Sequence, residues 1–136
     1  MEIEGINHVC LVVRDRTRAE WFYGEVLGFA KHEKVNSWYT LCPSKSTLHI
    51  IEVTEAGVDK SWYHQVQHVA FQVPNLRKIL ATLLGANLKP FQMDFEGNTK
   101  PLNSPDDDLS FGIGTIFVED PSENLVEFLQ LGHGMF

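Results

Sequence analysis

The stretch His8-Val9-Cys10-Leu11-Val12-Val13 decides the fold, because a close copy, His68-Val69-Ala70-Phe71-Gln72-Val73, begins 60 positions later. Both stretches are rich in β-branched and other apolar residues, and each is typical of a β-strand. Side chains alternate along a strand, so each His shares its face with the residues two and four positions after it. An internal repeat of this kind predicts a chain built from two similar modules.

The two faces of each predicted strand differ in character. One face is wholly apolar in both copies, and we expect a helix to pack on it. The other face carries the His and could line a pocket. The pocket candidates on that face are Cys10, Val12 and Gln72, although a small core residue is the plainer interpretation of Cys10.

A helical pattern follows each of these strands. Apolar residues recur at the i, i+3, i+4 spacing of an amphipathic helix in residues 19–27 and again in residues 76–84. The predicted boundary residues are Thr17 and Glu20 as a capping box, Asn75 as an N-cap, and Gly28 and Gly85 as C-terminal stops.

Further strand-like stretches complete each half. They are residues 35–42 and 48–54 in the first half and residues 89–95, 112–119 and 124–131 in the second, with a long loop over residues 97–110. The order of elements therefore predicts an α+β fold in which two βαβββ modules form a curved mixed sheet. We expect a single domain over residues 1–136, with module 1 at about 1–60 and module 2 at about 61–136.

Composition limits the class of partner. The hydrophobic fraction of 43% and charged fraction of 21% are those of a soluble globular protein. A net charge of −7 with scattered Lys and Arg argues against nucleic acid or an anionic membrane and leaves a small molecule as the expected partner. The acidic start of the chain does not resemble a signal peptide, and Cys10 and Cys42 are too few for a disulfide framework, so we expect a cytoplasmic protein.

Each half ends in a strand that carries an acid among apolar residues, Glu52 in the first and Glu127 in the second. An unpaired buried carboxylate costs several kcal/mol and therefore needs a counter-charge or a metal. If the repeat is arranged around a pseudo-twofold axis, these acids can converge with His8 and His68. Imidazole and carboxylate ligands together suit a divalent Zn, Fe, Mn, Ni or Co ion.

Three segments resemble the vicinal oxygen chelate superfamily, which contains glyoxalases, bleomycin resistance proteins and dioxygenases. Ile6-Asn7-His8-Val9 is similar to the opening strand of that family. Trp21-Phe22-Tyr23-Gly24-Glu25-Val26-Leu27-Gly28-Phe29 resembles its "FYxxVLGF" helix end. Glu119-Asp120-Pro121-Ser122-Glu123-Asn124-Leu125-Val126-Glu127-Phe128 resembles its "DPxGNxxEF" turn and last strand, with Glu123 in place of the usual glycine.

The resemblance implies a metal set and a reaction type. His8, His68 and Glu127 match the His/His/Glu ligands of most active members, and Glu52 matches the fourth ligand of glyoxalase I. It implies a lyase or isomerase whose small substrate chelates the metal through vicinal oxygens, with Glu52 or Glu127 as the catalytic base. It also implies a homodimer.

Departures from the family pattern keep other functions open. Val12 and Ala56 stand where bacterial glyoxalase I has an Arg and an Asn, which argues against glutathione, and Cys10 stands where fosfomycin-modifying members have a Thr. One alternative is an Fe²⁺ ring-cleaving, extradiol-type dioxygenase, which would leave Glu52 unligated. The other is a non-catalytic small-molecule binding or resistance protein that uses no metal.

Two further residues have only structural roles in this interpretation. His49 alternates to the face opposite Glu52, so we expect it to serve packing or solvent contact and not metal binding. Trp38 could form part of a substrate wall, but the core or a dimer interface is the plainer expectation.

Overall fold

The computed structural model describes residues 2–41, 46–54 and 67–136, so Cys42 and Ala56 lie outside the described residues. The chain divides into two compact units, Met1–Asp59 and Lys60–Phe136.

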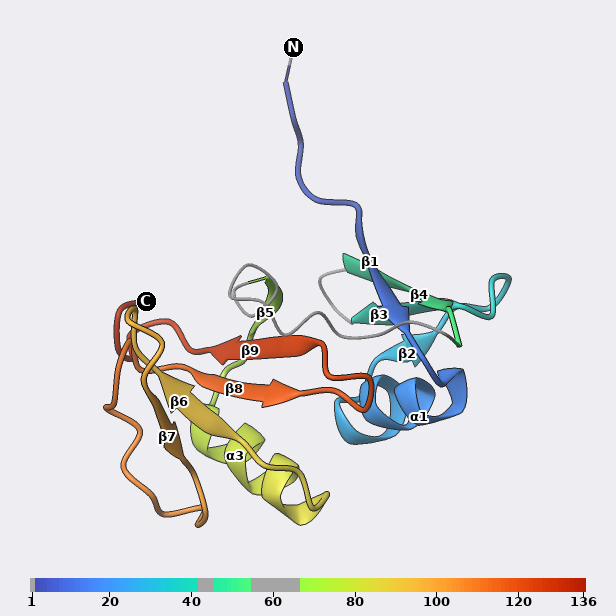
Figure 1. Cartoon of the computed structure of the whole chain (residues 1–136). Helices are drawn as coiled ribbons and strands as arrows, with labels where there is room; N and C mark the ends of the chain where they lie inside the picture. The colour runs from blue at the N-terminus through green and yellow to red at the C-terminus, as the bar shows by residue number, and fades with distance from the viewer. Residues whose placement is uncertain (1, 42–45, 55–66) are drawn as a thin grey trace. The chain divides into compact units, whose positions relative to one another are not determined.

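The first unit contains a four-stranded sheet in the order β1-β4-β3-β2 (Figure 1). Its strands are β1 (His8–Val13), β2 (Ala30–Lys31), β3 (Trp38–Leu41) and β4 (Ser46–Glu52). Strand β1 runs parallel to β4, and the other neighbouring pairs are antiparallel. The short strand β2 was not predicted, because two residues carry too little alternation to detect.

A helical segment packs on one face of this sheet. It begins as α1 (Arg16–Glu20) and continues as the π-helical turn η1 (Trp21–Val26). The buried side chains of Val13, Leu48 and Ile50 share one face of the sheet. The predicted capping box of Thr17 and Glu20 is wrong, because Asp15 is the N-cap and its side chain accepts a hydrogen bond from the Arg18 amide at 3.1 Å.

The second unit repeats this arrangement with one more strand, in the order β5-β9-β8-β6-β7. The strands are β5 (His68–Gln72), β6 (Phe91–Met93), β7 (Thr99–Pro101), β8 (Ile116–Glu119) and β9 (Leu125–Leu129). Strand β5 is parallel to β9, as β1 is to β4. Helix α3 (Leu76–Gly85) has Asn75 as its N-cap and ends at Gly85, so both predicted boundaries are confirmed.

The long stretch predicted as a loop is partly a strand and is otherwise attached to the core of the second unit. Strand β7 lies within it, and Leu102 and Leu109 are buried. The buried Gln92 amide donates to the carbonyls of Leu109 at 2.9 Å and Thr115 at 3.2 Å. The amides of Asn103 and Ser104 donate to Asp107 and lower the pKa of its carboxyl. These hydrogen bonds attach the stretch to the rest of the second unit.

The predicted α+β fold of two repeated βαβββ modules is confirmed. In each unit a first strand, a helix and an antiparallel set of strands follow in the same order, and the last strand returns to lie beside the first. Across the described ranges, we find no helix with the length and apolar character of a membrane span.

Candidate metal centre

His68 and Glu127 meet on one face of the second sheet. The parallel register of β5 and β9 pairs Ala70 with Glu127, so His68 and Glu127 are diagonal neighbours on adjacent strands. The Nε2 atom of His68 lies 2.7 Å from Oε2 of Glu127. The sequence predicted that these two side chains meet, and the structure brings them together.

The Glu127 carboxylate is in an unusual environment. The residue is only 4% exposed, and its Oε1 atom is buried without a hydrogen-bond partner among the described residues. A buried carboxylate with an unsatisfied oxygen is destabilising, because burial removes the water that would otherwise solvate it. This atom is therefore suited to an additional cationic partner.

The distance between these two atoms fits a metal site. Donors bound to one cation at about 2.1 Å and at right angles lie about 3 Å apart. The 2.7 Å separation of His68 Nε2 and Glu127 Oε2 is close to that value. Without a cation, a proton shared between imidazole and carboxylate holds the same pair together.

His8 and Glu52 do not form an equivalent pair in the first unit. The register joins His8 to Thr47 at one end of the β1–β4 pair and Val13 to Glu52 at the other. Thr47, the residue beside His8, lies five residues before Glu52 along β4, which corresponds to about 17 Å at about 3.3 Å per residue. The structure therefore does not support the prediction that Glu52 is a ligand beside His8.

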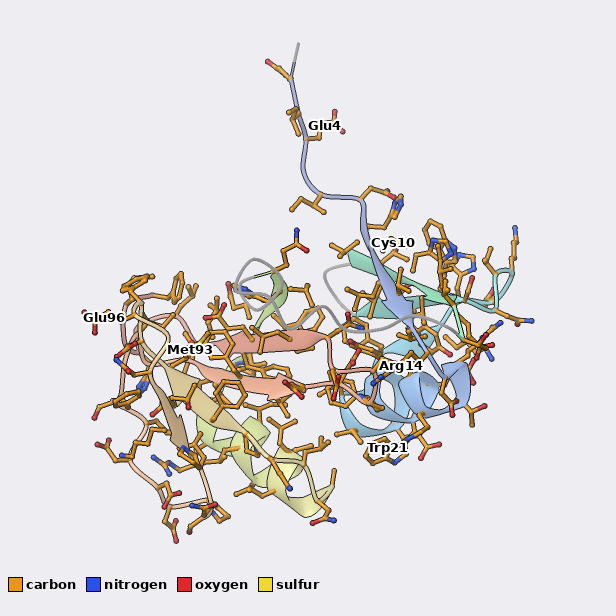
Figure 2. The ribbon with its side chains drawn as sticks, in the orientation of Figure 1. Glu4, Cys10, Arg14, Trp21, Met93 and Glu96 are labelled. Carbon is orange, nitrogen blue, oxygen red and sulfur yellow. The ribbon has the colours of Figure 1, made fainter. Side chains whose placement is uncertain are left out.

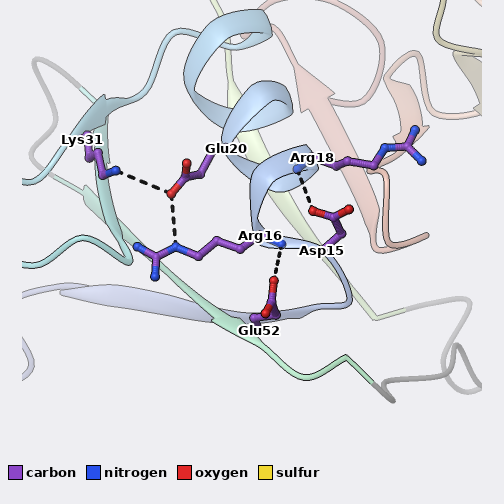
Figure 3. Close-up of polar contacts among 6 residues, drawn as sticks. All are labelled: Asp15, Arg16, Arg18, Glu20, Lys31 and Glu52. Carbon is purple, nitrogen blue, oxygen red and sulfur yellow. Dashed lines mark hydrogen bonds and ion pairs between the residues drawn. The ribbon is translucent and has the colours of Figure 1, made fainter.

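Glu52 instead contacts the start of the first helix. Its Oε2 atom accepts a hydrogen bond from the backbone amide of Arg16 at 2.7 Å (Figure 3). In the second unit Gln130 accepts the amide of Leu76, again the first residue of a helix, at 2.8 Å. In the two parallel strand pairs, Ile51 lies beside Val12 and Leu129 lies beside Gln72, and Val12 and Gln72 are equivalent residues of the repeat. Glu52 and Gln130 come directly after Ile51 and Leu129. They are thus equivalent residues with the same helix-capping contact.

The residue equivalent to Glu127 in the first unit is His49. The register pairs Cys10 with His49 and Ala70 with Glu127, and Cys10 and Ala70 both stand two residues after the first-strand His. His49 therefore shares a face with His8. Sequence reasoning set His49 aside because it could not know which residue of β4 lies beside β1.

The structure assigns the remaining candidates to the same faces. Cys10, a free cysteine labelled in Figure 2, and Val12 are exposed on the His8 face of β1, and Gln72 is exposed on the His68 face of β5. In residues 2–41, 46–54 and 67–136, no three His, Cys, Asp or Glu side chains lie close enough together to hold a metal ion. Within the first unit His8 and His49 share a face, and within the second unit His68 and Glu127 do.

The sequence of residues 5–128 matches the model of the Glyoxalase/Bleomycin resistance protein/Dioxygenase superfamily. The chain belongs to this superfamily. The resemblance seen in the three sequence motifs is thereby confirmed. No curated protein matches the sequence significantly.

Solved structures of this superfamily fold have varied roles. The trypanothione-dependent glyoxalase I of Leishmania major is similar at 19% identity and a TM-score of 0.62, covering 94% of this chain and 87% of that one. The oxidase ChaP-H2 is similar at 19% identity and a TM-score of 0.64, covering 98% of each chain. The antibiotic-binding protein TnmS3 of Streptomyces sp. CB03234 is similar at 16% identity and a TM-score of 0.59, covering 96% of this chain and 98% of that one. At these identities the likeness shows the fold alone, and the reaction has to be argued from the residues of this chain.

Proposed function

We propose that this chain is a metal-dependent enzyme of the glyoxalase type, a lyase or isomerase that binds one divalent cation through His8, His68 and Glu127. Its substrate is a small molecule that chelates the cation through two adjacent oxygens. The observation that supports this most strongly is the buried Glu127 carboxylate, with Oε2 at 2.7 Å from His68 and Oε1 without a partner in the described residues. A cation would compensate a charge whose burial is otherwise costly.

The fourth ligand in this proposal is His49 and not Glu52. His49 lies at the position that matches Glu127, and Glu52 accepts the Arg16 amide on the other side of its strand. Three imidazoles and one carboxylate form a donor set that suits Zn²⁺, Ni²⁺, Co²⁺ or Fe²⁺. Two positions of an octahedral ion would remain for the substrate.

Glu127 is the proposed catalytic base. When bound, the cation would act as a Lewis acid toward the substrate oxygens. With the substrate held there, the Glu127 carboxylate would accept a proton from the carbon next to the chelating oxygens, as a general base does. Glu52 is the other acid considered for this role, and its hydrogen bond to the Arg16 amide directs it to the helix.

A second candidate function has one specific observation in its favour. With Glu52 used as a helix cap, His8, His68 and Glu127 make a set of two imidazoles and one carboxylate. This is the ligand set of many Fe²⁺ oxygenases. An extradiol-type ring-cleaving dioxygenase is therefore the alternative to the isomerase.

Metal analysis and substrate screening separate the candidates. Protein purified without oxygen should contain about one divalent ion per chain by elemental mass spectrometry. Conversion of a 2-oxoaldehyde hemithioacetal with Ni²⁺, Zn²⁺ or Co²⁺ supports the isomerase, and oxygen-dependent cleavage of catechols with Fe²⁺ supports the dioxygenase. If the protein neither retains nor binds a metal, both are wrong, and a binding function such as that named for TnmS3 takes their place.

Variants test the ligand set. Glu127→Gln removes the proposed charged ligand at nearly constant volume and should weaken metal binding by about 100-fold or more in a chelator competition assay. Glu52→Gln is the matched control and should change metal affinity by less than about threefold. Equal losses in both variants would restore Glu52 as a ligand. Light scattering of the same samples tests the homodimer that we infer from the family.

A further inference from the structure

The His8 ring has a hydrogen-bond partner that determines which nitrogen is available. Its Nδ1 atom lies 2.9 Å from the side-chain Oδ1 of Asn7. This contact favours the tautomer with the proton on Nδ1 and the lone pair on Nε2, because an amide oxygen accepts hydrogen bonds. Asn7 is itself tied to the sheet, because its backbone carbonyl accepts the Thr47 amide at 3.3 Å.

Trp38 contacts both imidazoles of the first unit. The register of β3 and β4 places Trp38 directly opposite His49, and their rings are stacked with centroids 4.9 Å apart and planes at 24°. The indole also contacts His8, with centroids 4.8 Å apart and planes at 46°. One side chain thus restricts the rotation of two rings that come from different strands.

The second unit has an aromatic residue in the equivalent position. Phe117 lies opposite Glu127 in the register of β8 and β9, as Trp38 lies opposite His49. Its ring contacts His68 edge-on, with centroids 5.7 Å apart and planes at 73°. In both units an aromatic side chain from the strand beside the last one packs on the first-strand His.

We propose that Asn7 and Trp38 are positioning residues for a divalent cation: Asn7 sets the His8 tautomer that presents Nε2, and Trp38 holds the His8 and His49 rings in place before the ion arrives. This inference rests on the proposed metal-dependent function. Two loosely held imidazoles would lose side-chain entropy when they bind a metal, and contacts made beforehand reduce that loss. Outer contacts that fix ligand tautomer and orientation strengthen metal binding in this way.

The tautomer can be observed without any metal. Nitrogen NMR of protein labelled at histidine, at about pH 8.5 and thus above the ordinary imidazole pKa of about 6.5, should find His8 protonated at Nδ1. Asn7→Leu should lose this signature, whereas Asn7→Asp, which keeps an acceptor oxygen, should retain it. The same His8 tautomer in all three proteins would overturn the role of Asn7.

Metal affinity tests the positioning itself, with Zn²⁺ as the probe and a chelator as competitor. Trp38→Leu and Asn7→Leu should each bind Zn²⁺ about tenfold more weakly, and the conservative variants Trp38→Phe and Asn7→Asp should stay within about threefold of the original protein. Trp21→Leu is the matched control, because Trp21 is half-buried like Trp38 but lies on the helical segment (Figure 2). It should leave Zn²⁺ affinity unchanged.

The outcomes distinguish this inference from the function on which it rests. Circular dichroism first establishes that each variant is folded. If Trp38→Leu is not folded, Trp38→Met, which also removes the aromatic ring, takes its place and should show the same loss of about tenfold. Full Zn²⁺ affinity in a folded Trp38→Leu variant would overturn the role of Trp38. If the unaltered protein binds no metal, the proposed function and this inference both fail. If it binds Zn²⁺ and the variants bind more weakly, but no substrate is converted, the positioning role stands and only the proposed reaction is wrong.

Discussion

At the scale of single residues, Glu52 and Glu127 have similar surroundings in sequence but opposite environments in the fold. Both acids stand among apolar strand residues. Glu127 is buried against His68, whereas Glu52 is exposed and its carboxylate accepts a backbone amide. The Glu52 carboxylate is held by an amide at a helix start, whereas Glu127 keeps one buried oxygen, Oε1, without a hydrogen-bond partner among the described residues. The proposed chemistry therefore rests on Glu127 and not on Glu52.

A close backbone contact in the second unit also depends on one residue. Gly112 has φ +62°, and a Cβ there would overlap the carbonyl oxygen of Met93. We expect Gly112→Ala to destabilise the protein by about 3 kcal/mol or more, because the left-handed conformation and the overlap both oppose a side chain. Denaturant unfolding measures this loss.

Gly97 provides the matched control for this prediction. It also has a positive φ of +86°, but within the described part of the chain no atom beyond its two chain neighbours lies within 4 Å of the position of an added Cβ. Gly97→Ala should therefore cost only about 1 kcal/mol, the conformational part of the penalty. Similar losses for the two variants would mean that the contact with Met93 is not the cause.

At the scale of elements, each unit has a hydrogen bond between a side chain at the end of its last strand and the first amide of its helix. Asp15 and Asn75 cap the two helices through their side chains. The residues directly after these caps, Arg16 and Leu76, begin the helices. Their backbone amides donate hydrogen bonds to the side chains of Glu52 and Gln130. The amides at a helix start have no partner within the helix, so each unit satisfies them with side chains from elsewhere in its chain.

This equivalence predicts how Glu52 tolerates substitution. Glu52→Gln keeps an acceptor oxygen, as Gln130 does in the second unit, and should change the free energy of unfolding by only about 0.5 kcal/mol. Glu52→Ala leaves the Arg16 amide without its acceptor and should cost about 1 kcal/mol, as other cap removals do. Gln130→Ala should cost a similar amount. Thermal unfolding of the three variants tests the prediction, and a large loss in Glu52→Gln would show that the charge itself is required.

At the scale of the whole molecule, the proposed cation should stabilise the folded protein if it binds. A ligand that binds only the folded state raises the free energy of unfolding by about 2.7 kcal/mol at 100 times its dissociation constant. We expect added Zn²⁺ to raise the unfolding temperature of the original protein and a chelator to reverse the effect. Glu127→Gln should show no such rise. A rise of equal size in that variant would indicate a Zn²⁺ site elsewhere.

The sequence by itself determined the repeat, the order of the helices and of the longer strands, the superfamily, and the pairing of His68 with Glu127, but not the short strands β2 and β7. These follow from local periodicity and from motifs that stand close together in the chain. The predicted capping box at Thr17 is wrong because the helix begins earlier, with Asp15 as its N-cap.

Only the tertiary structure decided which residue stands opposite which. Side chains alternate along a strand, so a shift in pairing register changes which residues share a face and which lie near a given neighbour. Sequence spacing joined Glu52 to His8, but the register places His49 on the His8 face and turns Glu52 to the helix. Register depends on the packing of the whole sheet, which no local stretch of sequence specifies.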